Sequence, residues 1–194
     1  MRLAALAFAT IGLLATPAFA DDCADEIKAV MEAAMSSGPL HMETTITSPD
    51  SVMTMSGDLV PPQNLRMTVT TNGQGVEMVI LDGRAWMNVS ELWVELPPDA
   101  AAEVASTFDL SNTSALDDMT DAQCNGTVTV DGEDYLSYNW NLSAEGADTV
   151  NAILADPEAM VPLYMETEVT TGDVVSQVVV DYTYDETITI TAPQ

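Results

Sequence analysis

The side chains of this chain that could carry chemistry are one histidine, two cysteines, 12 methionines and 31 carboxylates. His41 would have to serve any Ser-His-Asp arrangement, yet no nucleophile motif such as G-x-S-x-G accompanies it. Two carboxylates are enough for glycoside hydrolysis, but among so many acidic residues no particular pair stands out. The sequence therefore predicts no catalytic residues and no enzyme.

Metal binding is the second chemistry to consider. Thioether and imidazole ligands can hold copper, so His41, Met42, Met53 and Met55 are candidate ligands. His41 and Met42, however, fall on opposite faces of a predicted strand, and the methionines do not form a tight cluster. The acidic runs also lack the spacing of an EF-hand. We expect neither a bound metal nor a cofactor, and a periplasmic copper-binding protein is kept as an alternative.

The methionines show a pattern of their own, because they alternate with polar residues in successive short runs. One face of the predicted strands is thus apolar and rich in methionine. Methionine is flexible and polarizable, which suits both irregular cores and surfaces that accept varied apolar partners. The face is therefore interpreted either as a soft structural core or as the wall of a cavity. Its residues include Met42, Ile46, Met53, Met55, Met67, Val69, Met78 and Ile80.

The elements that position these residues follow from periodicity and turn residues. An apolar stripe that includes Cys23, Ile27, Val30 and Met31 predicts a first helix, which Gly38-Pro39 ends. Short β-type runs follow, and their short connections make neighbouring strands antiparallel. We predict strands at about 40–48, 51–60, 64–71, 75–82, 84–89 and 91–96.

The second half of the chain mixes both patterns. Residues 98–108 and 114–123 are predicted as helices, and a further helix over 144–154 would place Val150, Ile153 and Leu154 on one face. Strands are predicted at 127–130, 135–142, 163–170, 174–184 and 187–191. The fold class is therefore α+β, a single domain over residues 21–194 with a strongly curved antiparallel sheet and helices packed on it.

The start of the sequence has the three parts of a secretory signal peptide: Arg2, an apolar run and a small-x-small ending at Ala20. The residue after this cut is not cysteine, so we expect a soluble protein with neither a lipid anchor nor a membrane span. In an exported chain, Cys23 and Cys124 predict a disulfide. Such a bridge would add roughly 4–5 kcal/mol of stability on the chain-entropy model.

The charge of the chain limits its partners. The formal net charge is −27, with only four lysines and arginines. Nucleic acids and anionic lipid surfaces would be repelled, so neither is expected as a partner. The acidity is interpreted as a means of solubility, with binding of a basic partner or of cations as the alternative.

Several short motifs also resemble a known family. They are Val79–Trp86 (VILDGRAW), Leu92–Val94 (LWV), Leu163–Glu166 (LYME), Asp181–Asp185 (DYTYD) and Ile188–Pro193 (ITITAP). Together with the order of elements, they resemble the LolA/LolB-like superfamily of exported lipid- and lipoprotein-binding proteins, and within it most of all the LppX/LprG group.

The resemblance implies an open half-barrel whose concave face, capped by helices, holds acyl chains or lipoproteins. The methionine-rich residues named above would then form the cavity wall, and Met31, Met35, Leu116 and Met119 would lie in the lid. The function expected is non-catalytic binding or carriage of a lipid or acyl chain in the periplasm. A protein-interaction or sensor module on the same fold, with a transient protein partner, is the other alternative.

Overall fold

The computed structural model describes residues 20–107, 113–144 and 146–194. Helix α1 (Ala20–Ser36) begins at the last residue of the predicted signal peptide, and the rest of that peptide lies outside the described residues. No helix in the described ranges is long and apolar enough to cross a bilayer.

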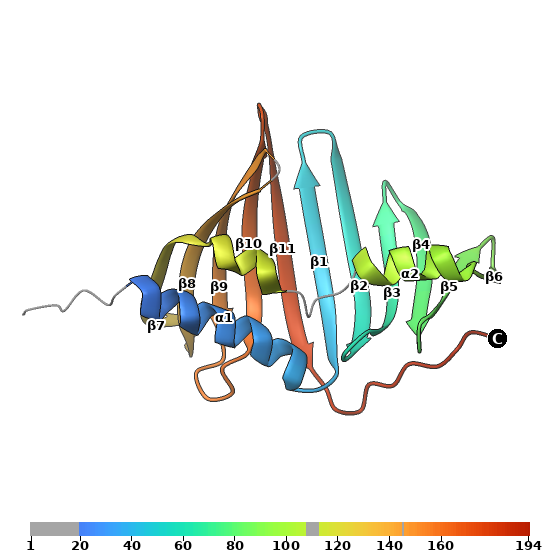
Figure 1. Cartoon of the computed structure of the whole chain (residues 1–194), viewed down its shortest axis with the longest axis horizontal. Helices are drawn as coiled ribbons and strands as arrows, with labels where there is room; N and C mark the ends of the chain where they lie inside the picture. Colours follow the sequence, from blue (N-terminus) through green and yellow to red (C-terminus); the bar gives the residue numbers. More distant parts are fainter. Residues whose placement is uncertain (1–19, 108–112, 145) are drawn as a thin grey trace, which may run out of the picture.

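In the described part of the chain, 11 strands form one antiparallel sheet that does not close (Figure 1). The order across the sheet is β6-β5-β4-β3-β2-β1-β11-β10-β9-β8-β7, so the first and last strands of the chain pair at its centre. The strands are β1 (Leu40–Ser48), β2 (Ser51–Val60), β3 (Asn64–Thr71), β4 (Gln74–Leu81), β5 (Arg84–Val89), β6 (Leu92–Glu95), β7 (Thr120–Val130), β8 (Glu133–Ala144), β9 (Ala147–Ala155), β10 (Pro162–Thr171) and β11 (Val174–Tyr184).

The helical segments all lie on one face of the curved sheet (Figure 1). Helix α1 and the 3-10 helix η1 (Thr113–Asp118) pack over β7, β8 and β10, whereas α2 (Pro98–Thr107) packs over β5. This is the α+β half-barrel with helices on its concave face that the sequence predicts, and the prediction of fold class is confirmed.

Two separate cores hold the helices to the sheet. The first contains Ile27 and Val30 of α1 against Tyr138, Trp140 and Ile153. The second lies under α2, where Ala101 packs with apolar residues of the first five strands, namely Leu40, Leu59, Leu65, Met67, Ile80 and Ala85. The alternation of apolar and polar residues along each strand directs these side chains to the concave face.

The first six strands lie within a residue of their predicted limits because tight turns separate them. At Asn72-Gly73 and Asp82-Gly83 both residues have positive φ, between 52° and 79°. Two such residues form the turn type whose twist matches that of a hairpin, and Asn-Gly and Asp-Gly are its preferred sequences.

The predicted helix over 144–154 is wrong, because this segment forms strand β9. Asn151, Ile153 and Ala155 are at most 5% exposed, whereas Val150 is 54% exposed, which is the two-residue period of a strand. Pairing with β8 on one side and β10 on the other provides hydrogen-bond partners for the backbone N–H and C=O groups of this segment. Tertiary pairing here outweighs an apolar spacing that also fits a helix.

Two further elements differ from the prediction. Of the helix expected over 114–123, only η1 is helical, and β7 begins at Thr120. The last segment, 187–191, is not a strand but extends along the convex face to β5 and β6 (Figure 1). There Thr191–Gln194 shares a recess with Arg66, Val79 and Trp93, and Val79 is only 1% exposed although it lies on the convex face.

The predicted disulfide is present. Cys23 of α1 and Cys124 of β7 are bonded across 101 residues, with their Cα atoms 5.6 Å apart. The Tyr138 hydroxyl donates a 2.8 Å hydrogen bond to Glu26 of the same helix. Together these contacts attach α1 to the β7 edge of the sheet.

Candidate functional site

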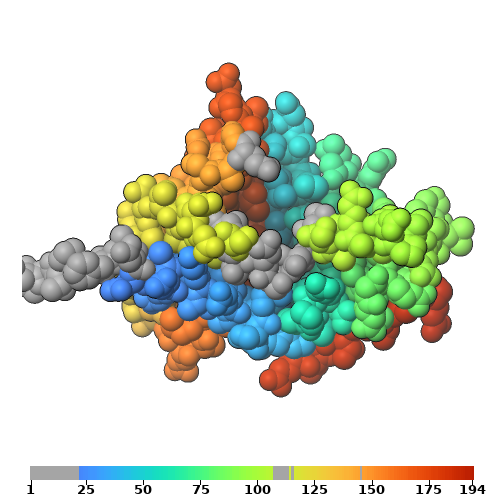
Figure 2. All heavy atoms as spheres, in the orientation of Figure 1, coloured from blue at the N-terminus to red at the C-terminus, as the bar shows by residue number. Residues whose placement is uncertain are grey.

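An apolar cavity of about 250 Å³ lies on the concave face at the centre of the sheet, between the two cores. Figure 2 shows strands β11 and β1 recessed behind η1 and α2 in this region. The cavity is lined by residues of β1, β2, β3, β10 and β11: Met42, Thr44, Met55, Gly57, Leu59, Leu65, Met67, Met165, Val178, Val180 and Tyr182.

A smaller cavity of about 70 Å³ continues from the first beneath the C-terminal half of α1. The two share Met42 and Tyr182, so these residues stand at their junction. The helix contributes Met31 and Met35 to the wall of this second part. This second part therefore lies between α1 and the sheet.

Gly57 helps to keep the centre of the sheet hollow. It lies between Met42 of β1 and Met67 of β3 and has no side chain to fill the space in front of it. A Cβ atom on Gly57 would lie 2.8 Å from the carbonyl oxygen of Arg66 and 3.1 Å from the Met67 Cα. Strands β2 and β3 can therefore approach this closely only because residue 57 is glycine.

Charge is separated between the two faces of the sheet. The register of β1–β4 and β9–β11 places every acidic or basic side chain of these strands on the convex face, and the concave face carries only apolar and neutral polar residues. The convex residues are His41, Glu43, Asp58, Arg66, Glu77, Asp148, Glu166, Glu168 and Asp181.

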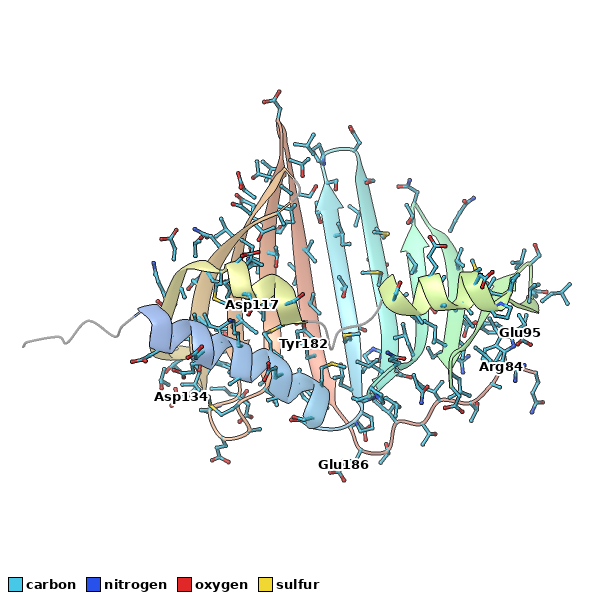
Figure 3. The ribbon with its side chains drawn as sticks, in the orientation of Figure 1. Arg84, Glu95, Asp117, Asp134, Tyr182 and Glu186 are labelled. Atoms are coloured by element: carbon cyan, nitrogen blue, oxygen red, sulfur yellow. A yellow bond between two sulfur atoms is a disulfide. The ribbon has the colours of Figure 1, made fainter. Side chains whose placement is uncertain are left out.

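The three strong cations in the described ranges are paired away from the cavity. Lys28 contacts Asp117 at 2.8 Å, which links α1 to η1. Arg66 contacts Glu77 at 2.6 Å on the convex face. Arg84 contacts Glu95 at 2.7 Å near β6, at the far edge of the sheet in Figure 3. The site therefore offers no positive charge to an anionic ligand.

Tyrosine and threonine supply the polar groups near the cavity. Burial raises the pKa of Tyr182 to about 12, so its hydroxyl is uncharged at neutral pH. Burial also raises the pKa of Tyr184, whose hydroxyl donates to the Pro162 carbonyl oxygen at 3.1 Å. Thr44 adds a second hydroxyl to the cavity wall.

Two solved structures share the overall fold of this chain. The lipoprotein LppX of Mycobacterium tuberculosis superposes with a TM-score of 0.61 at 15% sequence identity, over 84% of this chain and 94% of LppX. LprF of Mycobacterium bovis gives a TM-score of 0.61 at 9% identity, over 90% of this chain and 97% of LprF. This chain has the LppX-like fold. No family model and no curated protein sequence matches it.

The LppX-like fold confirms the resemblance that the sequence motifs suggest, at the level of architecture. A LolA superfamily protein from Nitrosomonas europaea is also similar, with 11% identity over 85% of this chain and 91% of that protein, and a TM-score of 0.37.

The structure places the residues predicted for the cavity in three groups. Met42, Met55 and Met67 line the central cavity, and Met31 and Met35 line its extension under α1. Three others belong to the core under α2: Val69, Met78 and Ile80. These three and the remaining four residues lie outside both cavities. The four are Ile46 and Met53, half-buried towards the β1–β2 turn, and Leu116 and Met119, which pack in the core under α1.

Sequence reasoning missed the contribution of the closing strands to the central cavity. Val178, Val180 and Tyr182 of β11 and Met165 of β10 all line it. Their alternation with Val179, Asp181 and Glu166 is the same signal that identified the methionines of the first strands. Only the pairing of β11 with β1 brings these residues to the same place.

His41 lies apart from the methionines, as the alternation predicts. Its Nδ1 atom is 2.7 Å from Asp58 on the convex face, whereas Met42 points into the cavity. Among the described residues there is no group of three or more histidine, cysteine, aspartate and glutamate side chains placed to hold a metal ion.

Proposed function

We propose that this protein binds and carries a hydrophobic ligand, a lipid or an acyl chain, in its methionine-lined cavity and performs no catalysis. The observation that carries the proposal is the apolar, uncharged cavity at the centre of the concave face. Sites for small apolar ligands are typically concave and mostly apolar. An engineered apolar cavity of about 150 Å³ already stays dry and takes up benzene, and this cavity is larger.

The driving force for binding would be removal of alkyl surface from water. Each methylene group that enters the cavity contributes roughly 0.8 kcal/mol. Methionine side chains at 42, 55 and 67 can adjust to chains of different shape because the thioether has several rotatable bonds. The acidic convex face would keep the loaded carrier in solution.

The disulfide supports a site of action outside the cytoplasm. Bonds such as Cys23–Cys124 persist in oxidising compartments and are rare where thiols are kept reduced. The LppX-like fold and the signal-peptide pattern agree with this placement, and we propose the periplasm as the compartment.

Adjacent threonines of β1 allow a matched test of the proposal. Thr44 lines the cavity, and Thr45 is exposed on the opposite face of the strand. Thr44→Phe should fill part of the cavity and weaken binding of an apolar fluorescent probe. The affinity should fall by about tenfold if the larger side chain keeps two methylene groups of the probe in water. Thr45→Phe should leave binding unchanged. Probe titration of the purified protein measures both.

Mass spectrometry of organic extracts gives a second measurement. Purified protein should release a stoichiometric lipid, and the Thr44→Phe variant should release less than the Thr45→Phe variant. Extracts without lipid, together with a probe that is bound equally by all three proteins, would contradict carriage in this cavity.

A further inference from the structure

The Tyr182 hydroxyl is one of two hydroxyls, with that of Thr44, that lie in the cavity wall. Tyr182 lies on β11 opposite Met42 and lines both parts of the cavity. Figure 3 shows it at the middle of the sheet, between α1 and α2. Within the described residues its hydroxyl forms no hydrogen bond, and burial alone accounts for its raised pKa.

Tyr184 provides the comparison within the same strand. It lies two residues further along β11, on the same face, and its hydroxyl donates to the Pro162 carbonyl oxygen. The Tyr182 side chain is half-buried, so its hydroxyl is open to the cavity and can donate to a molecule that enters it. The Tyr184 hydroxyl thus bonds within the protein, whereas the Tyr182 hydroxyl is available to a ligand in the cavity.

The surroundings of Tyr182 restrict what could accept its hydrogen bond. The concave face carries no acidic or basic side chain on the strands around it, and the three cations are paired elsewhere. A carboxylate or phosphate drawn into this space would lose its hydration without gaining a counter-charge. An uncharged oxygen would accept the Tyr182 hydrogen bond at no such cost.

We infer that Tyr182 is a specificity residue, and that its hydroxyl donates a hydrogen bond to the ester carbonyl of a neutral lipid bound in the cavity. The ligand class is then an uncharged acyl ester, not a free fatty acid. This inference rests on the proposed function, since it requires that the cavity take up a lipid.

Three probes of equal chain length test the assignment by displacement of an apolar fluorophore from the purified, lipid-extracted protein: decane, methyl decanoate and decanoate. Tyr182→Phe removes only the hydroxyl, so methyl decanoate should bind roughly threefold to tenfold more weakly, which is the usual worth of one hydrogen bond. Binding of decane should not change. In the unaltered protein, decanoate should bind more weakly than its methyl ester.

Tyr184→Phe is the matched control and should leave the ratio of ester to alkane affinity unchanged. A second readout is the infrared stretch of a carbonyl-labelled ester, which should lie at lower frequency in the unaltered protein than in Tyr182→Phe. A structural role of the hydroxyl would move neither this frequency nor the affinity ratio.

The outcomes separate the two proposals. If none of the probes binds to the unaltered protein, the proposed carrier function fails. If decane and the ester bind but Tyr182→Phe changes neither their ratio nor the carbonyl frequency, only the role of Tyr182 is overturned. The role of Tyr182 is also overturned if the Thr44→Val variant loses the preference for the ester over the alkane while the Tyr182→Phe variant keeps it.

Discussion

At the scale of single residues, the properties of the site come from a few side chains whose neighbours are distant in sequence. Gly57 leaves space in front of the central strands, and Tyr182 places one hydroxyl in that space. Neither residue is unusual in the sequence. Each acquires its role from the strands that flank it, β3 in the case of Gly57 and β1 in the case of Tyr182.

The glycine predicts a difference in stability. Gly57→Ala should lower the free energy of unfolding by about 1–3 kcal/mol, because the added Cβ meets backbone atoms that must shift. Gly75→Ala in β4 is the control, since its Cβ would approach nothing closer than 3.5 Å. Urea unfolding of both variants measures this. Equal losses in the two variants would contradict the close approach at Gly57.

Tyrosine ionisation predicts a loss of stability in alkali. The folded-state pKa of Tyr182 is raised from 10.0 to about 12, so the protein favours the neutral phenol. The preference for the neutral phenol contributes about 2 kcal/mol to the free energy of unfolding. This contribution is complete below pH 10 and is lost as the pH rises towards 12. Urea unfolding between pH 8 and about 12 should show a shallower decline for Tyr182→Phe. Parallel declines in the two proteins would contradict this.

At the scale of elements, local pattern and pairing partners compete. The hairpins of the first half are specified by Asn-Gly and Asp-Gly turns together with strict alternation, so their strands were predictable. The segment of β9 has apolar residues at both helical and strand spacing, and its two neighbouring strands decide the outcome. Long-range pairing of this kind has no signal within a short window of sequence.

The attachment of α1 gives a prediction at the same scale. Replacing Cys23 and Cys124 by alanine should lower the free energy of unfolding by about 2–5 kcal/mol, because the unfolded chain gains freedom. Urea unfolding with and without a reductant measures the effect. The reductant should destabilise the unaltered protein and leave the double variant unchanged. Equal stability of the oxidised and reduced unaltered protein would show that the bridge contributes little.

At the scale of the whole molecule, one sheet passes through two cores and connects them at the β1–β11 pair. We propose that residues 21–194 form a single domain for this reason. The cavity lies where the helices over the two cores leave the concave face uncovered, while acidic residues crowd the convex face. The two faces of this curved sheet are therefore an apolar concave face and a strongly negative convex face.

The net charge of −27 predicts stabilisation by salt. Repulsion among surface carboxylates acts over the Debye length, which is about 10 Å at 0.1 M ionic strength and about 3 Å at 1 M. At neutral pH, raising sodium chloride from low salt to about 1 M should increase the Tm by roughly 3–8 °C. Thermal unfolding by circular dichroism measures this. A flat response would contradict the role of repulsion, and a rise that continues unchanged above about 1 M would indicate salting-out instead of screening.

Composition and alternation by themselves determined much about this protein: the α+β class, the first helix, the first six strands, the disulfide and an apolar face rich in methionine. These depend on interactions between residues that are close in sequence, or on the presence of only two cysteines. The closure of β11 on β1, the strand β9 and the path of the last residues were decided by tertiary structure.

The cavity itself is also a feature that the tertiary structure decided. Met42 and Met55 could be assigned to one face from the sequence and line the cavity, but Ile80 and Leu116 at equally apolar positions are buried in the cores. Whether a side chain lines a cavity or is packed in a core depends on where α1 and α2 lie over the sheet, and their positions follow from the packing of the whole chain. Alternation specifies the face, and packing specifies which part of that face stays open.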